Sequence, residues 1–400
     1  MTVITGRLAP AILAFAAVVA TPAARPIRAE PESLARASPE LRRNLEADAY
    51  TYFRFVNRPW IARVCEAFAD VPDMPIVRLH GDAHVGQFAI TSDAWGLDDF
   101  DDSARGPAVI DIVRFLGSID LVARHRGWTK ERTALFTRFL DGYRRGLSDP
   151  DYRAPQPEVV HRLQAQPAVT RESFLQWGES QMQQMTDAEL AAVIQGMKAF
   201  SDLIRRDHDD LPPEYFRVVR AGWLHMGVGS AEELKVLLRI EGPSADPADD
   251  ELIEAKRLGS LDGLTCLEEP PSPQTARVII GSHQMGRLKH RILSPGPDLV
   301  IPELLVVGTS LGDWWIRSWD PSYREIRLDD FHSVQDLAEV IYDSGTQLGA
   351  GSLHEVTGPE ADTVRRRQLA SMKALEPRLR RQTVELVDDL LKGWRELRSR

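Results

Sequence analysis

Residues 79–88 read Leu-His-Gly-Asp-Ala-His-Val-Gly-Gln-Phe, which is the densest polar segment of the chain in an otherwise apolar setting. The apolar run at 76–79 predicts a strand directly before it. Residues 88–91 and 95–98 predict a hairpin that turns at Ser92 and Asp93 directly after it. The polar loop is therefore expected to be held at both ends by β-structure, which favours a functional site.

A second polar segment follows the predicted hairpin, Leu97-Asp98-Asp99-Phe100-Asp101-Asp102, and Asp111 comes soon after it. An acid on a fixed loop and another at the end of the next hairpin can converge on one point. Phosphoryl transfer needs such a set, because one carboxylate orients the accepting hydroxyl and others hold magnesium ions. The pattern therefore favours phosphoryl transfer.

The order of predicted elements is helix-rich, then β-rich, then helix-rich. Helical spacing dominates residues 31–75 and 108–216. Strands are expected at 218–226, 234–240, 251–256, 304–307 and 314–318, with one helix at 274–285. This order predicts an α+β fold with a helical lobe at 30–215, a β-rich lobe at 216–330 and C-terminal helices at 331–400 that pack on the helical lobe.

Composition excludes several classes of protein. The 400 residues are 43% hydrophobic and 27% charged, so a disordered chain is excluded. The formal net charge of −10 argues against nucleic acid as a partner, because phosphate backbones would be repelled. No stretch is long and apolar enough to predict a stable membrane span.

The first 29 residues resemble a secretory signal peptide. They carry Arg7, an apolar run at 8–20 and small residues afterwards, with no acid. Cleavage after Ala23 or Ala29 would leave a small residue at the exit position. A periplasmic or secreted location follows if the signal is real, and a cytoplasmic one otherwise. Export would also allow a disulfide between Cys65 and Cys266, which the sequence alone cannot place near each other.

The motifs resemble those of the uncharacterised bacterial family called domain of unknown function 2252, over about residues 50–351. Its Gly-Asp-x-His-x-x-Asn-Phe pattern stands here as Gly81-Asp82-Ala83-His84-Val85-Gly86-Gln87-Phe88. Its Asp-Phe-Asp-Glu pattern stands as Asp99-Phe100-Asp101-Asp102, followed by Gly106-Pro107 and Asp111-Ile112-Val113-Arg114. These segments are also similar to the phosphate-transfer motifs of aminoglycoside phosphotransferases and protein-kinase-like enzymes.

The resemblance implies a role for each of these polar residues. Asp82 would be the catalytic base, and Gln87 and Asp99 would bind magnesium. Asp111 would orient the catalytic loop, and His80 would hydrogen-bond its backbone. Asp101 belongs to an acidic cluster that either binds a second cation or faces solvent. His80 and His84 could instead be ligands of a two-metal phosphoesterase, but the further motifs of those enzymes are missing.

The β-rich lobe resembles the nucleotide lobe of kinases. Gly227, Gly229 and Ser230 would form the turn that covers the phosphates of ATP, and Lys256 would pair with those phosphates. Because this lysine follows the catalytic loop instead of preceding it, the resemblance implies a circularly permuted protein-kinase-like fold with a β-rich nucleotide lobe and a helical catalytic lobe. Mg²⁺ and ATP would be the cofactors, and the phosphoryl acceptor would be an unknown small molecule or protein.

Three departures support an alternative, an exported pseudokinase-like binding or scaffold protein without turnover. Gln87 replaces the family's asparagine, and the glutamate that usually pairs with the lysine falls at Ile280. The predicted phosphate loop continues into Glu232 and Glu233, which would repel phosphate. Lys256 could then be a solvent-facing strand lysine. Both functional hypotheses follow from the sequence.

Overall fold

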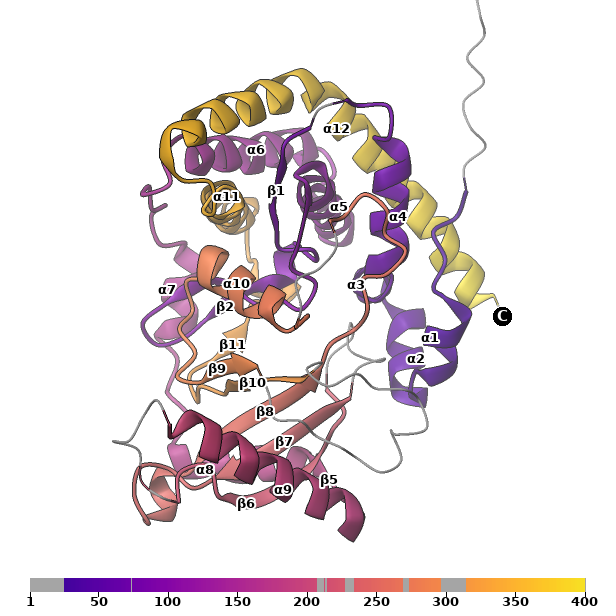
Figure 1. Cartoon of the computed structure of the whole chain (residues 1–400). Helices are drawn as coiled ribbons and strands as arrows, with labels where there is room; N and C mark the ends of the chain where they lie inside the picture. Colours follow the sequence, from indigo (N-terminus) through magenta and orange to yellow (C-terminus); the bar gives the residue numbers. More distant parts are fainter. Residues whose placement is uncertain are drawn as a thin grey trace, which may run out of the picture.

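The chain folds into a helical part and a six-stranded sheet with a cleft between them, in a computed structural model that describes residues 25–72, 74–206, 212, 214–226, 234–268, 273–295 and 314–399. The predicted α+β class is confirmed. Figure 1 shows the sheet below and the helical part above it. In the described part of the chain, no helix has both the length and the apolar character that crossing a bilayer requires.

Four short helices open the described chain, and they form one side of the helical part (Figure 1). They are α1 (Pro31–Arg36), α2 (Pro39–Ala47), α3 (Ala49–Phe55) and α4 (Asn57–Ala67). The side chain of Ser38 accepts a hydrogen bond from the backbone of Leu41 at the start of α2, and Asp48 does the same for Tyr50 and Thr51 in α3. Leu45 of α2 and Trp60 and Val64 of α4 are buried.

Two small antiparallel sheets hold the polar loop of residues 80–87. Strand β1 (Ile76–Leu79) pairs with β4 (Ala104–Pro107), and β2 (Phe88–Ile90) forms the predicted hairpin with β3 (Trp95–Leu97). Strand β11 (Arg324–Glu325), from much later in the sequence, adds to the edge of β2. A 3-10 turn, η1 (Val85–Gln87), leads directly into β2. The loop is therefore fastened at both ends.

Five further helices complete the helical part. They are α5 (Val109–His125), α6 (Arg132–Ser148), α7 (Glu158–Gln164), α11 (Val334–Ser352) and α12 (Ala361–Arg398), with 3-10 turns η4 (Leu328–Asp330) and η5 (Gly358–Glu360) before α11 and α12. The α6 and α11 backbones touch, because a Cβ at Gly142 or Gly146 would collide with a carbonyl of α11. The long α12 runs along the outside of this part and packs on α5 (Figure 1).

The large sheet has the order β5-β6-β7-β8-β10-β9, and all its pairs are antiparallel. Its strands are β5 (Met182–Gln183), β6 (Val218–Leu224), β7 (Lys235–Ile240), β8 (Glu251–Arg257), β9 (Leu293–Pro295) and β10 (Trp314–Ser318). The turn η2 (Pro247–Asp249) precedes β8, and α10 (Ala276–Met285) follows it. The strand predicted at 304–307 lies outside the described residues.

Helices α8 (Arg171–Gln181) and α9 (Asp187–Ile204) cover opposite faces of this sheet. Val193 and Met197 of α9 pack on one face with Val236 and Leu238, whereas Phe174 of α8 packs on the other face. The β-rich unit therefore begins near residue 171, earlier than the boundary at 216 that the sequence predicts. Helical periodicity shows that α8 and α9 are amphipathic, but it does not show which core their apolar faces join.

Part of the segment interpreted as a signal peptide packs on α12. The backbone of Ile27 donates a hydrogen bond to the carbonyl of Asp389, and its side chain is buried. Arg28 forms an ion pair with Glu396. A cleavage after Ala23 would keep these contacts, and one after Ala29 would remove them. Residues 1–24 lie outside the described residues.

A disulfide joins Cys65 of α4 to Cys266, with the two Cα atoms 5.8 Å apart. The bond closes a loop across 201 positions of sequence. We expect its reduction to lower the free energy of unfolding by about 2–5 kcal/mol, because the crosslink restricts the unfolded chain. Urea unfolding with and without a reductant measures this. The Cys65→Ser/Cys266→Ser variant should be insensitive to the reductant, and a wild-type curve that does not move would contradict the expectation.

Candidate functional site

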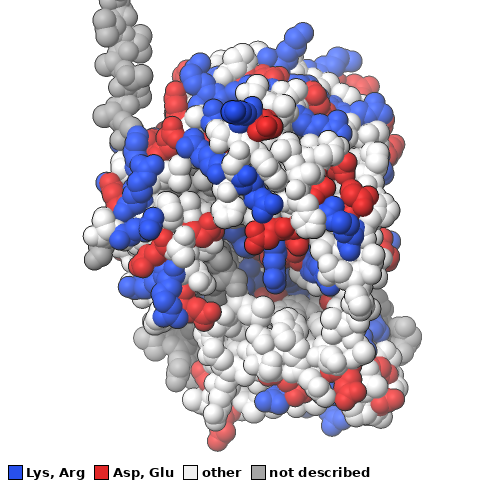
Figure 2. Space-filling model, turned by 180° about the vertical axis from the view of Figure 1, so that it is seen from behind, with Lys and Arg blue, Asp and Glu red and all other residues white. Residues whose placement is uncertain are grey.

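A cavity of about 690 Å³ lies between the large sheet and the small hairpin sheet. Seen from behind, the molecule has a hollow between its upper and lower parts, with basic atoms inside it and acidic atoms on its rim (Figure 2). Five predicted site residues line this cavity: Asp82, Gln87, Asp99, Asp101 and Lys256. His80 and Asp111 do not line this cavity, and the predicted turn with Gly227, Gly229 and Ser230 falls outside the described residues.

The loop that carries Asp82 is held in place by hydrogen bonds to Asp111, near the start of α5. The Asp111 carboxylate accepts the backbone N–H of His80 at 2.7 Å and that of Gly81 at 2.9 Å. Burial raises the pKa of Asp111, and these two hydrogen bonds oppose the rise. Gly81 has φ 86°, a left-handed backbone conformation that favours glycine. The sharp bend at Gly81 and the clamp from Asp111 together fix the position of Asp82.

His80 links this loop to the next acidic segment. Its Nδ1 accepts the backbone N–H of Asp82 at 3.4 Å, and its Nε2 lies 3.0 Å from the carbonyl of Asp98. With Nδ1 accepting, Nε2 carries the proton and donates it to that carbonyl. His80 is fully buried. These contacts are backbone contacts of the kind that the resemblance implies for His80.

Asp82 is anchored through one carboxylate oxygen. Arg114 of α5, fully buried, donates to Asp82 Oδ1 at 2.8 and 2.9 Å. Oδ2 has only longer contacts, 3.4 Å to Gln87 Nε2 and 3.5 Å to His84 Nε2. Burial opposes ionisation of Asp82, but the charge of Arg114 and the contact from His84 outweigh it and lower its pKa to about 2. Asp82 is therefore a carboxylate with one oxygen fixed and one available.

His84 is a neutral neighbour of Asp82. Burial lowers the pKa of His84 to about 4. The hydroxyl of Tyr50 accepts the backbone N–H of Gly86 at 2.9 Å, which leaves its own proton for His84 Nδ1 at 3.3 Å. His84 then carries its proton on Nε2, facing Asp82. The sequence motifs predicted no role for Tyr50 or Arg114, although Arg114 completes the Asp-x-x-Arg pattern of residues 111–114.

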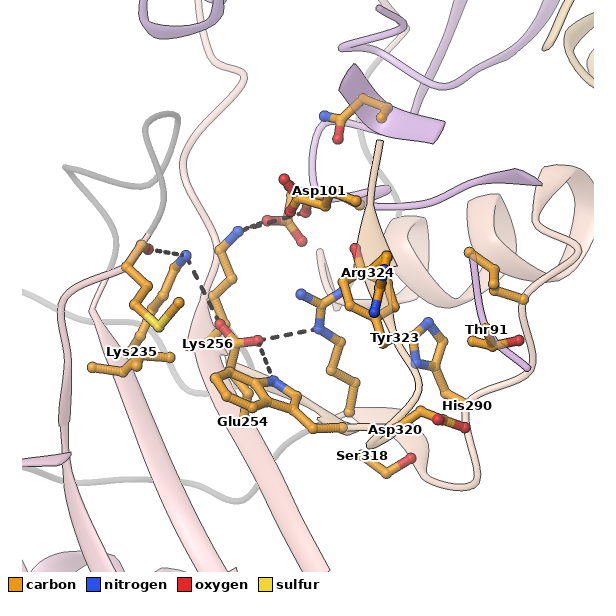
Figure 3. A pocket seen from close by; sticks show the side chains of 18 of the residues that line it. Thr91, Asp101, Lys235, Glu254, Lys256, His290, Ser318, Asp320, Tyr323 and Arg324 are labelled. Carbon is orange, nitrogen blue, oxygen red and sulfur yellow. Dashed lines mark hydrogen bonds and ion pairs between the residues drawn. The ribbon is translucent and has the colours of Figure 1, made fainter. Parts of the chain in front are cut away.

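Lys256 points from β8 toward the acidic segment after the hairpin (Figure 3). Its side chain is 5% exposed, so the alternative of a solvent-facing lysine is wrong. It forms a close ion pair with Asp101 and lies 3.7 Å from Asp99 Oδ1. Ile280 offers no charge to the lysine, whereas these two acids do. The alternative that Asp101 faces solvent is also wrong, since it is buried.

Asp99 adopts a left-handed backbone conformation, with φ 61°. A non-glycine residue there is strained, and such strain clusters at functional sites. Burial raises the pKa of Asp99, but the charges of Lys256 and Arg317 outweigh it and hold that pKa well below the usual range. Asp99 is therefore a charged carboxylate in the cleft.

A second charged cluster, centred on Glu254, was missed from the sequence. Glu254 is 2% exposed and accepts from Arg317 Nε and Trp319 Nε1, each at 3.1 Å, with Lys235 Nζ at 3.8 Å (Figure 3). Arg317 also pairs with Asp98 at 3.1 Å. The sequence did contain a sign of this cluster, because Glu254 and Lys256 are two residues apart in a predicted strand and therefore lie on the same face of it. Four charged side chains of the sheet therefore face the cleft and would contact a charged ligand there: Lys235, Glu254, Lys256 and Arg317.

The acids at this site suit a magnesium ion that is held partly by the protein and partly by a bound phosphate compound. Asp99 Oδ1 and Asp101 Oδ1 are buried and accept no hydrogen bond. Mg²⁺ commonly takes one or two protein carboxylates together with phosphate oxygens. No group of three or more His, Cys, Asp or Glu side chains suited to a metal occurs among the described residues. The ion could therefore be held by the carboxylates of Asp99 and Asp101 and the side-chain carbonyl of Gln87, but only with phosphate oxygens as further ligands.

The family model described as "Uncharacterized protein conserved in bacteria (DUF2252)" matches residues 35–219. The match contains the polar loop, the acidic segment and the Asp111–Arg114 pattern, so the resemblance implied by these motifs is confirmed. It ends before β7, so the assignments of Lys256 and the phosphate turn stay predictions.

A curated protein named glucosamine kinase, from Streptacidiphilus jiangxiensis, is 29% identical over 119 residues. The match covers 24% of this chain and 26% of that protein, so the chain spans about a quarter of the length of that relative. No solved structure matches the chain.

Proposed function

We propose that this protein is a kinase-like phosphotransferase that moves the terminal phosphoryl group of ATP to a hydroxyl of a small molecule. The observation that carries the proposal is that Asp82, Asp99 and Lys256 line one cavity, although they come from a loop, a hairpin end and a distant strand. In protein kinases the catalytic loop supplies a base and a magnesium ligand, a second acid holds magnesium, and a strand lysine grips the donor phosphates.

The sheet supports a kinase-like nucleotide lobe. Strands β6, β7 and β8 form a meander, and Lys256 lies on its third strand, as the phosphate-binding lysine does in protein kinases. Helix α10 follows that strand. The lobe comes after the catalytic loop in the chain, which supports the circular permutation that the resemblance implies. The match to a glucosamine kinase supports phosphotransfer in general terms.

Each residue then has a defined part in the reaction. The acceptor hydroxyl gives its proton to Asp82 Oδ2, while Arg114 keeps Oδ1 in place. The acceptor oxygen forms its bond to the terminal phosphorus as the bond from that phosphorus to ADP breaks. Lys256 holds the donor phosphates, which requires its pair with Asp101 to open. Magnesium, when bound, neutralises charge on the transferring group.

Nucleotide binding tests the proposal directly. We expect ATP with Mg²⁺, at a hundredfold excess over its dissociation constant, to stabilise the protein by about 2.7 kcal/mol. Lys256→Met and Asp99→Asn should remove most of this stabilisation, because they delete the phosphate cation and a metal ligand. Thermal-shift titrations with ATP, GTP and ADP, each with and without Mg²⁺, measure it.

The matched control is Lys198→Met, which removes an exposed lysine from α9 on the opposite face of the sheet. It should keep the full shift. No shift with any nucleotide, or an undiminished shift in Lys256→Met, would contradict the proposed function.

The close pair between Lys256 and Asp101 favours a second candidate, an exported pseudokinase-like binding protein. A lysine occupied by an acid is less ready to take phosphate. Export is supported by the disulfide, because such bonds persist in oxidising compartments. Nucleotide-dependent stabilisation without release of ADP in the presence of acceptors would select this candidate.

A further inference from the structure

A second cavity, of about 340 Å³, lies on the other side of Asp82. Its walls are residues 29–33 at the start of α1, the corner between α3 and α4, and residues 259–264 after β8. Three residues line both cavities: Arg54, Asp82 and Asp102. The two cavities therefore meet at the carboxylate that would accept a proton.

Asn57, at the start of α4, lines the second cavity and has an unsatisfied side-chain oxygen. Its Nδ2 donates to the carbonyl of Gly81 at 3.1 Å and to Asp102 Oδ2 at 2.8 Å. Both partners are acceptors, so the nitrogen must face them and Oδ1 must point away from them. The residue is only 8% exposed, and its buried Oδ1 has no hydrogen-bond partner. A ligand that donates a hydrogen bond would satisfy it.

Asp102 and Arg54 present unpaired charges where the cavities meet. Asp102 accepts a hydrogen bond from Asn57 but forms no ion pair within the described ranges. In that same part of the chain, the Arg54 guanidinium makes no hydrogen bond or ion pair. Asp82, Asp99 and Glu325 act on it only through their charges. The Asp102 carboxylate could accept a hydrogen bond from a ligand, and the Arg54 guanidinium could face a phosphoryl group.

The outer wall of this cavity is fastened to the helical part. Arg58 donates to the carbonyl of Ser260 at 2.7 Å and also to that of Asp262, and it lies 3.5 Å from Glu30. The disulfide ties Cys266, just beyond this wall, to α4. Ile61, Leu261 and Leu264 add apolar surface to the lining. The cavity thus combines acceptor atoms with apolar surface.

We propose that the second cavity is the acceptor subsite and that it takes a small polyhydroxylated molecule of monosaccharide size. This inference rests on the proposed function. Hydroxyl groups donate to Asn57 Oδ1 and Asp102, and the C–H faces of the molecule pack on the apolar wall. One hydroxyl reaches Asp82 Oδ2, and Arg54 lies where the phosphoryl group passes from the large cavity to the acceptor.

Blocking the cavity from its exposed wall tests the inference. Ser260 lines the cavity and its side chain reaches solvent, so Ser260→Trp should fill the space without disturbing the core. Asp262→Trp places the same side chain at an exposed position of the same loop that does not line the cavity. The probes are D-glucose, D-glucosamine and myo-inositol, titrated by calorimetry into the full chain with its disulfide intact and without nucleotide.

We expect at least one probe to bind the wild type, at least tenfold weaker binding in Ser260→Trp, and less than a twofold change in Asp262→Trp. Glucosamine alone would show that an amine pairs with Asp102, and binding of all three would show hydroxyl recognition. Absence of binding by every probe, or equal binding in Ser260→Trp, would overturn the inference. The ATP thermal shift should stay intact in both variants. A wild type that shows the ATP shift but binds no probe counts against the subsite alone, whereas a wild type without the ATP shift counts against the proposed function.

Discussion

Replacing Asp82 with asparagine is expected to lower kcat for phosphoryl transfer by about 10²–10⁴-fold, the range that a positioned general base contributes. Asparagine keeps the shape and can still accept from Arg114, but it cannot take the acceptor proton. Alanine is a poorer choice, because it would leave the fully buried Arg114 without its partner. Release of ADP in a coupled assay, with an acceptor that binds in the probe titrations, measures the change.

The matched control is Asp93→Asn, which changes an exposed acid in the turn between β2 and β3, the hairpin that follows the Asp82 loop. Its kcat should stay within about twofold of the wild type. Asp82→Asn should keep the thermal shift with ATP and Mg²⁺, which separates loss of chemistry from loss of binding. A kcat within a factor of ten of the wild type would show that Asp82 is not the base.

Replacing Arg114 with methionine is expected to lower the free energy of unfolding by about 3–5 kcal/mol, because Asp82 would remain as a buried charge without its partner. Arg114 also donates to the carbonyl of Phe53 at 2.9 Å, and its guanidinium lies 3.5 Å from the centre of the Phe53 ring. Urea unfolding at pH 7 measures the loss. The Asp82→Asn/Arg114→Met double variant should recover part of it, since no unpaired charge is left.

The pH dependence of the same pair has a defined sign. The pKa of Asp82 falls from 3.8 to about 2 on folding, so its ionisation contributes about 2 kcal/mol of stability. That contribution is complete above about pH 4 and disappears as the pH falls to about 2. Without Arg114 the pKa of Asp82 rises, so the stability gap between wild type and Arg114→Met should narrow over this range. A gap that stays constant with pH would show that packing on Phe53, and not the ion pair, explains the loss.

Local patterns predicted much of the region around the site. The strand at 76–79 and the hairpin that turns at Ser92 and Asp93 follow from short-range signals, and the structure contains both. The spacing of Asp82 and Asp99 along this loop and hairpin made their convergence foreseeable, and both line the large cavity. Strand β8 was also visible from its composition, with Lys256 on it.

The partners of these residues were not predictable from the sequence. The pairing of Lys256 with Asp101, of Asp82 with Arg114, and of Glu254 with Arg317 each depends on how separate elements pack. The same holds for α8 and α9, whose amphipathic pattern is compatible with either part of the molecule. The second cavity is built from residues 29–33, the α3–α4 corner and residues 259–264, which no local pattern connects.

The sequence by itself determined the α+β class, the polar loop between two β-elements, the match of residues 35–219 to a family model and the identity of the charged side chains. Those features depend on interactions within a few residues or on motif spacing. Only the tertiary structure decided which charges are paired, which oxygens of Asp82 and Asn57 are left available, and that two cavities meet at Asp82. The physical reason is that burial and pairing are set by contacts between distant parts of the chain, and these contacts decide both the pKa of a carboxylate and the space beside it.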